Sequence, residues 1–191
     1  MNVLVLGSGG REHALTWALA KSSHIGELYV APGNGGTAAI AKNVPLDILD
    51  AEAIIGFSRD NDIELVVVGP EAPLVEGVAE KVRHAGFAVF GPDAQGAQLE
   101  GSKSFSKEFM LAHDLPTARY KKCTSEQEAM AYLDEVGAPI VVKADGLAAG
   151  KGVIVADCLE DAQEAVRDCF AGDFGEAGSI VVIEEMLEGP E

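Results

Sequence analysis

The chain is poor in cysteine, in basic residues and in long apolar runs. Its 191 residues include three cysteines, Cys123, Cys158 and Cys169, whose wide spacing does not match a pair of metal ligands. We therefore expect reduced, structural thiols. Lysine and arginine number 14 against 31 aspartates and glutamates, which gives a net charge of −17. This balance argues against nucleic acids and anionic membranes as partners.

No apolar run is long enough to span a bilayer, and no signal peptide precedes the first apolar segment, residues 3–6. We therefore expect a soluble, cytoplasmic protein. No internal repeat or low-complexity tract is visible. With 48% hydrophobic residues, the chain is long enough for a buried core and for one or two domains.

The first half of the chain alternates apolar strand patterns with helical patterns. Strands are predicted at 3–6, 28–30, 65–68 and 87–90, and helices at 10–21, 51–60 and 75–85. Near-continuous apolar strands between helices are typical of an α/β fold with an open parallel sheet covered on both faces. Ligands of such sheets bind in the loops that follow the strands, and these loops are rich in glycine or proline here.

The pattern changes after Gly91-Pro92. Helices are predicted at 93–99 and 102–113, and Leu115-Pro116 has the character of a junction. Beyond it, strands are predicted at 119–123, 139–142, 153–156 and 179–183, and helices at 125–136 and 159–170.

The loop after the first strand suits a phosphate group. Gly9 and Gly10 open a helix, so free N–H groups and the positive end of the helix dipole lie together, and Arg11 adds a bidentate donor. A sugar monophosphate fits better than a dinucleotide, because Glu12 stands where the dinucleotide fingerprint has its third glycine. A tight turn without a ligand is the alternative.

Three other residues of this first helix carry expectations. His13 could face the ligand or could be an ordinary helix histidine, and the sequence favours neither. Trp17 and Leu19 are expected in the core.

A second glycine-rich segment, residues 143–153, lies between two apolar runs. Lys143 and Lys151 accompany glycines whose N–H groups can approach an anion, which suits a polyphosphate. An ordinary glycine-rich hairpin is the alternative. A Walker A loop is excluded, because only three residues separate Gly146 from Gly150 and Gly152 replaces the hydroxyl residue.

Six segments together resemble the phosphoribosylamine–glycine ligase (glycinamide ribonucleotide synthetase) family of the ATP-grasp superfamily, over essentially the whole chain. They are Gly7-Ser-Gly-Gly-Arg-Glu-His-Ala14, Pro32-Gly-Asn-Gly-Gly36, Gly69-Pro-Glu-Ala-Pro-Leu74, Ala97-Gln-Leu-Glu-Gly-Ser-Lys103, Lys143-Ala-Asp-Gly-Leu-Ala-Ala-Gly-Lys-Gly-Val153 and Glu184-Glu185. The resemblance implies a Rossmann-like, pre-ATP-grasp domain at residues 1–102 that helps to hold the phosphoribosyl substrate. It also implies the start of an ATP-grasp domain at 103–191, with an α+β lid subdomain at about 117–191.

The resemblance further implies an activity of purine biosynthesis. Members of the family join 5-phosphoribosylamine to glycine through a glycyl phosphate and convert ATP to ADP and phosphate. Lys103 and Lys143 match the family's catalytic ATP-phosphate lysines. The other matching ATP-binding positions are Gly146, Gly150, Lys151, Gly152, Glu184, Glu185, Met186, Leu187 and Glu191. The matching phosphate and ribose positions of the sugar substrate are Gly9, Gly10, Arg11, Asn34, Gly35, Pro70 and Glu71.

The chain departs from the family in stopping at Glu191, where the family continues. The ligands for Mg²⁺ or Mn²⁺ are expected beyond that residue and none within this chain, so we expect a fragment that does not turn over alone. The partners implied are small molecules only: 5-phosphoribosylamine, glycine and ATP. Three alternatives stay open, namely another ATP-grasp ligase or carboxylase, a nucleotide-binding module without catalysis, and a nicotinamide-dependent dehydrogenase.

Overall fold

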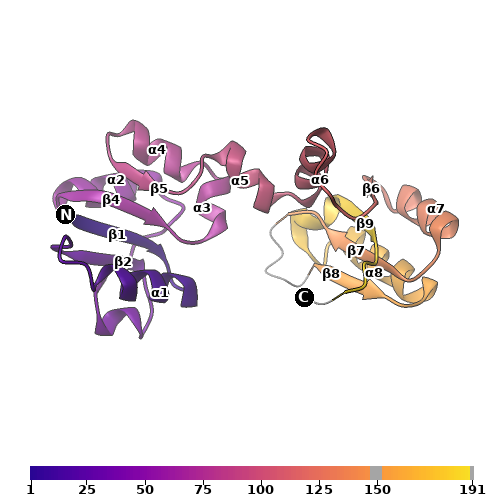
Figure 1. The fold of residues 1–191 in the computed structure, drawn as a ribbon, viewed down its shortest axis with the longest axis horizontal. Coiled ribbons are helices and arrows are strands. Elements are labelled where there is room, and N and C mark those ends of the chain that lie inside the picture. The colour runs from indigo at the N-terminus through magenta and orange to yellow at the C-terminus, as the bar shows by residue number, and fades with distance from the viewer. Residues whose placement is uncertain (147–151, 190–191) are drawn as a thin grey trace. The chain divides into compact units, whose positions relative to one another are not determined.

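Figure 1 shows a computed structural model of the chain, which describes residues 1–146 and 152–189. The chain divides into two compact units, Met1–Gln98 and Leu99–Glu191, and the division lies inside helix α5 (Ala94–Gly101). Leu115 and Pro116 lie within the second unit, so the junction expected there does not separate the two units. The domain boundary after residue 102 stays a prediction.

The first unit is built on five strands with helices between them. Its elements are β1 (Asn2–Gly7), α1 (Gly10–Leu19), β2 (Leu28–Pro32), the 3₁₀ turn η1 (Thr37–Ala39), β3 (Lys42–Asn43), α2 (Ala51–Asp60), β4 (Ile63–Val68), α3 (Glu71–Val75), α4 (Val78–His84) and β5 (Ala88–Phe90).

The five strands form a parallel sheet in the order β3-β2-β1-β4-β5. Alternate residues of β1 point to opposite faces: Leu4 and Leu6 belong to the core under α2 and α4, and Val3 and Val5 belong to the core under α1. The predicted open parallel sheet with two covered faces is thereby confirmed. The chain leaves β1 toward β2 on one side and returns to β4 on the other, so the strand order reverses beside β1. Open α/β sheets bind ligands outside the carboxyl ends at such a reversal.

Two helix predictions of this unit differ in outcome. Helix α2 begins where the sequence placed it, because the side chain of Asp50 accepts a hydrogen bond from Ala53 N and caps the helix. The predicted helix 75–85 is wrong in extent. Two helices, α3 and α4, stand there, and Gly77 with φ +71° lies between them in a conformation that side chains disfavour.

The second unit combines one sheet with three larger helices. Its elements are α6 (Lys103–Ala112), β6 (Tyr120–Cys123), α7 (Glu126–Val136), β7 (Ile140–Ala144), β8 (Val153–Ala156), α8 (Leu159–Ala171), the 3₁₀ helix η2 (Gly175–Ser179) and β9 (Val181–Glu185).

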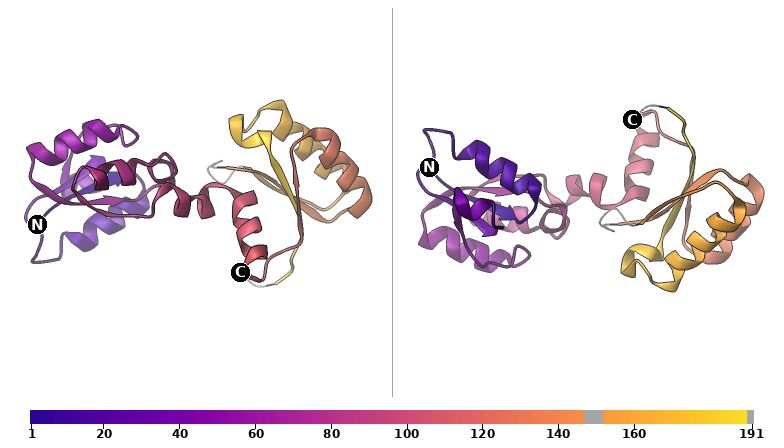
Figure 2. Two further views of the ribbon diagram at one scale, coloured as in Figure 1. Left: turned by 90° about the horizontal axis from the view of Figure 1, so that it is seen from above. Right: turned by 90° about the horizontal axis from the view of Figure 1, so that it is seen from below.

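The sheet of the second unit is antiparallel, in the order β6-β9-β7-β8. Helices α7 and α8 pack on one face, where their buried side chains meet those of Val142 and Ile183. Helix α6 lies against the other face, as both views in Figure 2 show. Residues that alternate with the buried core of β7 and β9 therefore point toward the α6 side, and Lys143 and Glu184 are among them.

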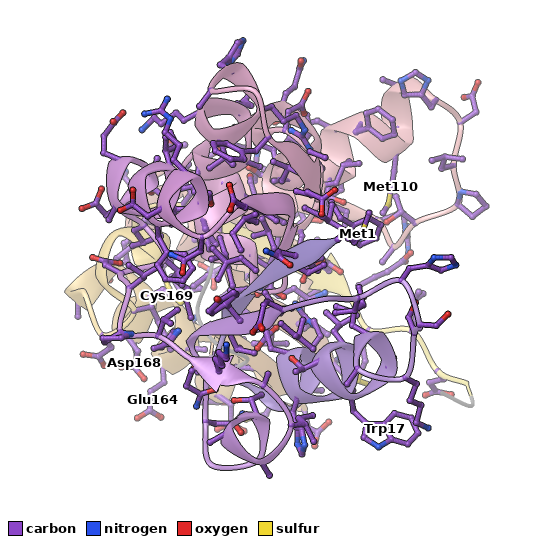
Figure 3. The ribbon with its side chains drawn as sticks, turned by 90° about the vertical axis from the view of Figure 1, so that its left-hand side faces the viewer. Met1, Trp17, Met110, Glu164, Asp168 and Cys169 are labelled. Atoms are coloured by element: carbon purple, nitrogen blue, oxygen red, sulfur yellow. The ribbon has the colours of Figure 1, made fainter. Side chains whose placement is uncertain are left out.

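Trp17 is not in the core as the sequence predicted. Its side chain is 54% exposed and projects outward from α1 (Figure 3), and the Lys21 ammonium lies 3.0 Å from the centre of its ring. The inward side of α1 combines the buried residues Glu12 and Thr16 with Leu15 and Leu19, which pack on the core, and Trp17 lies on the outward side. Leu19 packs against the core under α1 as expected.

The three cysteines are free thiols, of which Cys123 and Cys169 are buried. Burial raises the pKa of each of these two thiols to about 11. In the part of the chain that the structure describes, no helix combines the length and the apolar character needed to cross a membrane.

Candidate functional site

The first unit gathers its candidate site at the carboxyl ends of β1, β2 and β4. Gly9 precedes α1 and its N–H donates to the Glu12 carboxylate at 2.6 Å. Glu12 is buried, and a Cβ added at Gly7 or at Gly69 would overlap its side chain. Because Gly7 and Gly69 have no side chain, the Glu12 side chain fits between them and its carboxylate binds the Gly9 N–H. Gly10, by contrast, has open space where a Cβ would stand, at the start of α1.

Arg11 links the first loop to the loop after β4. Its guanidinium donates to Gly69 O at 2.7 Å and to the Glu71 carboxylate at 2.9 Å. The pKa of the Glu71 carboxyl is held below its ordinary value by a hydrogen bond from its own backbone N–H and by Arg11. The family resemblance implies that Arg11 and Glu71 are contacts of the sugar substrate. The structure brings them together, and in it they bind each other. A bound anion at Arg11 would compete with Glu71 for the same donors.

Asn34 ties the loop after β2 to the loop after β1. Its Nδ2 donates to Ser8 O at 2.8 Å, and its Oδ1 accepts from Gly36 N at 2.8 Å and Thr37 N at 3.0 Å. Thr37 is fully buried and donates to Asn43 Oδ1 at 2.8 Å. The Asn34 side chain is therefore engaged on both its donor and acceptor ends, and it shapes the loop that holds the candidate residues.

The remaining candidates of the first unit lie around this network. Gly35 is exposed with open space at its Cα, and Pro70 is half-buried at the start of α3. His13 is exposed, and its ring packs against Gly36, where an added Cβ would lie 2.6 Å from the ring. His13 therefore lies beside the loop that follows β2, which is one of the candidate loops.

In the second unit, Lys103 is held beside the glycine-rich segment. The Lys103 ammonium donates to Gly146 O at 2.9 Å, which joins the first turn of α6 to the first glycine of the segment. Asp145 fixes this arrangement: its carboxylate accepts from Ser104 Oγ at 2.6 Å, Ser102 Oγ at 3.1 Å and Ser104 N at 3.2 Å. A buried carboxylate at the first turn of a helix is also favoured by the helix dipole.

Lys143 and Glu184 form a buried charge cluster together with Lys107 of α6. Glu184 Oε2 lies 2.9 Å from Lys143 Nζ and 3.1 Å from Lys107 Nζ. The Glu184 and Lys107 side chains are 6% and 11% exposed, and that of Lys143 is 26% exposed. The cluster holds two positive charges and one negative charge, so it keeps a net positive charge on the face of the sheet where α6 lies.

The candidate adenine-binding segment follows the cluster at the end of β9. Glu185 accepts from Arg119 N at 2.8 Å and from Arg119 Nε at 2.7 Å, and these bonds hold the pKa of its carboxyl below the ordinary value. Met186 is half-buried and Leu187 is exposed. Since both glutamate side chains already have cationic partners, the backbone of this segment is the part suited to a neutral base.

The glycine-rich segment itself is described only at its two ends. Gly146 has φ +109°, and an added Cβ would lie 3.2 Å from that of Ala177. Gly152 O accepts from Ala144 N at 2.8 Å and so closes the base of the β7–β8 connection. Gly150, Lys151 and Glu191 lie outside the described residues. Among residues 1–146 and 152–189, no group of three or more His, Cys, Asp and Glu side chains is arranged to hold a metal ion.

Sequence reasoning missed Glu12, Asp145 and Lys107, which are all buried and charged. Glu12 had a local signal, because it stands three residues after the helix cap Gly9, where a glutamate can close a capping box. Asp145 and Lys107 had no local signal, since Ser104 lies 41 residues from Asp145 and Glu184 lies 77 residues from Lys107 in the sequence.

Comparisons with known proteins identify the family of both parts of the chain. The family described as "Phosphoribosylglycinamide synthetase, N domain" matches residues 1–100, and "Phosphoribosylglycinamide synthetase, ATP-grasp (A) domain" matches residues 101–191. The chain is 57% identical to the phosphoribosylamine–glycine ligase of Pseudomonas aeruginosa and 55% identical to that of Escherichia coli. Each alignment covers the whole chain and 45% of the relative, so the chain spans a little under half the length of these proteins.

Solved structures of similar fold include a member of the same family. The crystal structure of phosphoribosylamine–glycine ligase from Thermotoga maritima is similar with a TM-score of 0.81 and 33% identity, over all of this chain and 45% of that one. The N5-carboxyaminoimidazole ribonucleotide synthetase of Thermus thermophilus has a TM-score of 0.69 at 20% identity, over 97% of this chain and 47% of that one. The latter likeness concerns the fold alone.

Proposed function

Since the chain belongs to the phosphoribosylglycinamide synthetase family, we propose that the protein joins 5-phosphoribosylamine to glycine with hydrolysis of ATP. The glycine carboxylate attacks the terminal phosphorus of ATP, and ADP leaves. The amine of the sugar then attacks the carbonyl carbon of glycyl phosphate, phosphate leaves, and glycinamide ribonucleotide is the product. ATP binding and Mg²⁺ or Mn²⁺ are part of the proposal, and the metal ligands are expected from residues that this chain does not contain.

One observation carries the proposal: two lysines lie close to Gly146, the first glycine of the glycine-rich segment. Lys143 lies near the end of β7, three residues before Gly146, and Lys103 donates to the carbonyl oxygen of Gly146 although it lies 43 residues away in the sequence. Two ammonium groups beside backbone N–H groups suit a polyphosphate chain. Removing one preorganised charge from a transferring group typically costs about 3 kcal/mol of barrier, or about 10²–10³ in rate.

We assign the three loops of the first unit to the sugar phosphate. Gly9, Gly10 and Arg11 offer the start of α1, and the Asn34–Gly35 and Pro70–Glu71 loops flank it. The Glu12 carboxylate already accepts from Gly9 N, so this loop offers a smaller set of amides than a dinucleotide loop. That arrangement supports a single phosphate group as its ligand.

Calorimetry with ATP on the 191-residue chain tests the nucleotide site. We expect weak binding by the wild type and at least a tenfold loss in Lys143→Ala, equivalent to about 1.4 kcal/mol. Lys121→Ala is the matched control, because Lys121 lies in the same sheet but pairs with Glu128 of α7. Equal affinity of the wild type and Lys143→Ala would show that Lys143 is not a phosphate contact.

Product analysis tests the reaction. The protein at the full length of its natural reading frame should form glycinamide ribonucleotide from phosphoribosylamine, glycine and ATP. A carboxylated purine precursor as the product would instead assign the protein to the ATP-grasp carboxylases. A change in NADH fluorescence on binding would favour a dehydrogenase, and we expect no such change.

A further inference from the structure

The charge cluster of the second unit contains one lysine that the nucleotide proposal does not use. Lys107 is a buried residue near the middle of α6, and its ammonium makes three polar contacts within the second unit. It lies 3.1 Å from Glu184 Oε2, donates to Thr117 Oγ1 at 2.7 Å and donates to Ala118 O at 3.3 Å. These three acceptors match the three N–H donors of an ammonium group, so Lys107 is built into the protein and is not positioned to bind a ligand.

Lys143 differs from Lys107 in its surroundings. Its side chain is 26% exposed against 11% for Lys107, and both ammonium groups approach the same oxygen, Oε2 of Glu184. Lys143 is therefore the member of the cluster that can turn toward an anion. When Lys143 turns toward an anion, the Glu184 carboxylate loses that ion pair and needs another cationic partner.

The energetics of that exchange depend on Lys107. A buried carboxylate left without a cationic partner is strongly destabilising. If Lys143 were the only partner of Glu184, a phosphate group would have to separate a buried ion pair in order to bind it. Because Lys107 also contacts Glu184, the carboxylate keeps a counter-charge when Lys143 engages a ligand, and the cluster keeps a net positive charge.

We propose that Lys107 is a positioning residue for the nucleotide site: it neutralises Glu184, so that the charge of Lys143 stays available to the phosphates. This inference rests on the proposed ATP-binding function. It assigns a role to a residue outside the glycine-rich segment and outside any contact with the ligand. It also accounts for the presence of a carboxylate beside a phosphate-binding lysine, since Glu184 and Lys107 together orient Lys143 without cancelling its charge.

A double-mutant cycle on the 191-residue chain tests the inference, with ATP affinity measured by calorimetry. Lys107→Met should weaken ATP binding at least tenfold, because Glu184 then competes for Lys143. In a Glu184→Gln background, the same Lys107→Met change should alter affinity less than twofold, because no carboxylate is left to neutralise. The cycle isolates this coupling from any contact that Glu184 itself makes with the nucleotide.

Two further variants make the test independent of folding defects. Lys107→Arg keeps the positive charge and should bind ATP within threefold of the wild type. Lys122→Met removes a lysine that pairs with the exposed carboxylate of Glu108, and it should change affinity less than twofold. Far-UV circular dichroism checks that each variant is folded.

The outcomes separate the two proposals. An equal loss from Lys107→Met in both backgrounds, or a tenfold loss in folded Lys107→Arg, would overturn the role of Lys107 while leaving ATP binding intact. If the wild type bound no ATP, or if Lys143→Ala bound ATP as tightly as the wild type, the nucleotide site and this inference would both be overturned.

Discussion

The anchoring of α6 by Asp145 leads to a quantitative prediction for stability. Asp145→Asn keeps the shape of the side chain but replaces one acceptor oxygen with an NH₂ group. The carboxylate accepts from two serine hydroxyls and one backbone N–H, at 2.6 to 3.2 Å, in a buried position. A hydrogen bond to a charged acceptor contributes about 1.5–3 kcal/mol. The charge at the first turn of α6 adds about 0.5 kcal/mol.

Together these terms predict a loss of about 3 kcal/mol in the free energy of unfolding of the second unit. For a unit of this size the urea dependence is about 1–1.5 kcal/mol per M, so the midpoint should fall by about 2–3 M. Urea unfolding followed by far-UV circular dichroism measures this shift. Trp17 is the single tryptophan of the chain and lies in the first unit, so its fluorescence should follow the unfolding of that unit and should not move.

Asp168→Asn is the matched control for this measurement. Asp168 is exposed near the end of α8 and points outward (Figure 3), so its substitution should change the free energy of unfolding by less than about 0.5 kcal/mol. If Asp145→Asn and Asp168→Asn unfolded at the same urea concentration, the three hydrogen bonds of Asp145 would not stabilise α6, and the reasoning would be refuted.

Two more predictions concern buried ionisable groups. Glu12→Ala should lower the free energy of unfolding of the first unit by about 2 kcal/mol, because Gly9 N loses its acceptor, and Trp17 fluorescence measures this change. Glu12→Gln keeps an acceptor oxygen and should lose less than half of that free energy. Equal losses in the two variants would contradict this explanation. Because burial raises the pKa of Cys123 and Cys169 from 9.0 to about 11, the folded chain holds protons that the unfolded chain releases, so stability is complete below pH 9 and falls as the pH rises toward 11. Urea unfolding at a series of pH values should show a shallower fall for the Cys123→Ala/Cys169→Ala variant, and unchanged slopes would show that these thiols do not cause the decline.

The architecture could be predicted because it follows from local patterns. The apolar runs that became β1 and β4 are buried on both sides, and a run of that kind between helices has few other solutions than a covered parallel sheet. The starts of α2, α6 and α7 could be placed because Asp50, Ser102 and Ser125 each accept a hydrogen bond at the helix start. Strand β3 could not, since Lys42–Asn43 is too short to carry a pattern.

The candidate residues could be named from local glycine patterns and from the family resemblance, but most of their partners could not. Lys143 stands next to a glycine-rich segment, so its chemistry was visible from neighbouring residues, whereas Lys103 was identified only through the family resemblance. The pairing of Glu184 with Lys107 and of Asp145 with Ser104 could not be found in that way, because these partners meet through tertiary packing of α6 on the sheet. Trp17 was misplaced for a related reason: the turn closed by Glu12 sets the rotation of α1, and hydrophobicity alone does not encode that rotation.

The attachment of α6 to the sheet dictates where the chain can be dissected. The loop at Leu115–Pro116 is an attractive cutting point for a protease or for a shortened expression clone. A piece beginning there would lose Ser104 and Lys107, and would leave Asp145 and Glu184 with fewer of their counterparts in an apolar setting. Stranding a buried ion costs about 3–5 kcal/mol, a large share of the stability of a small domain. An autonomous carboxyl-terminal piece should therefore start upstream of Ser102.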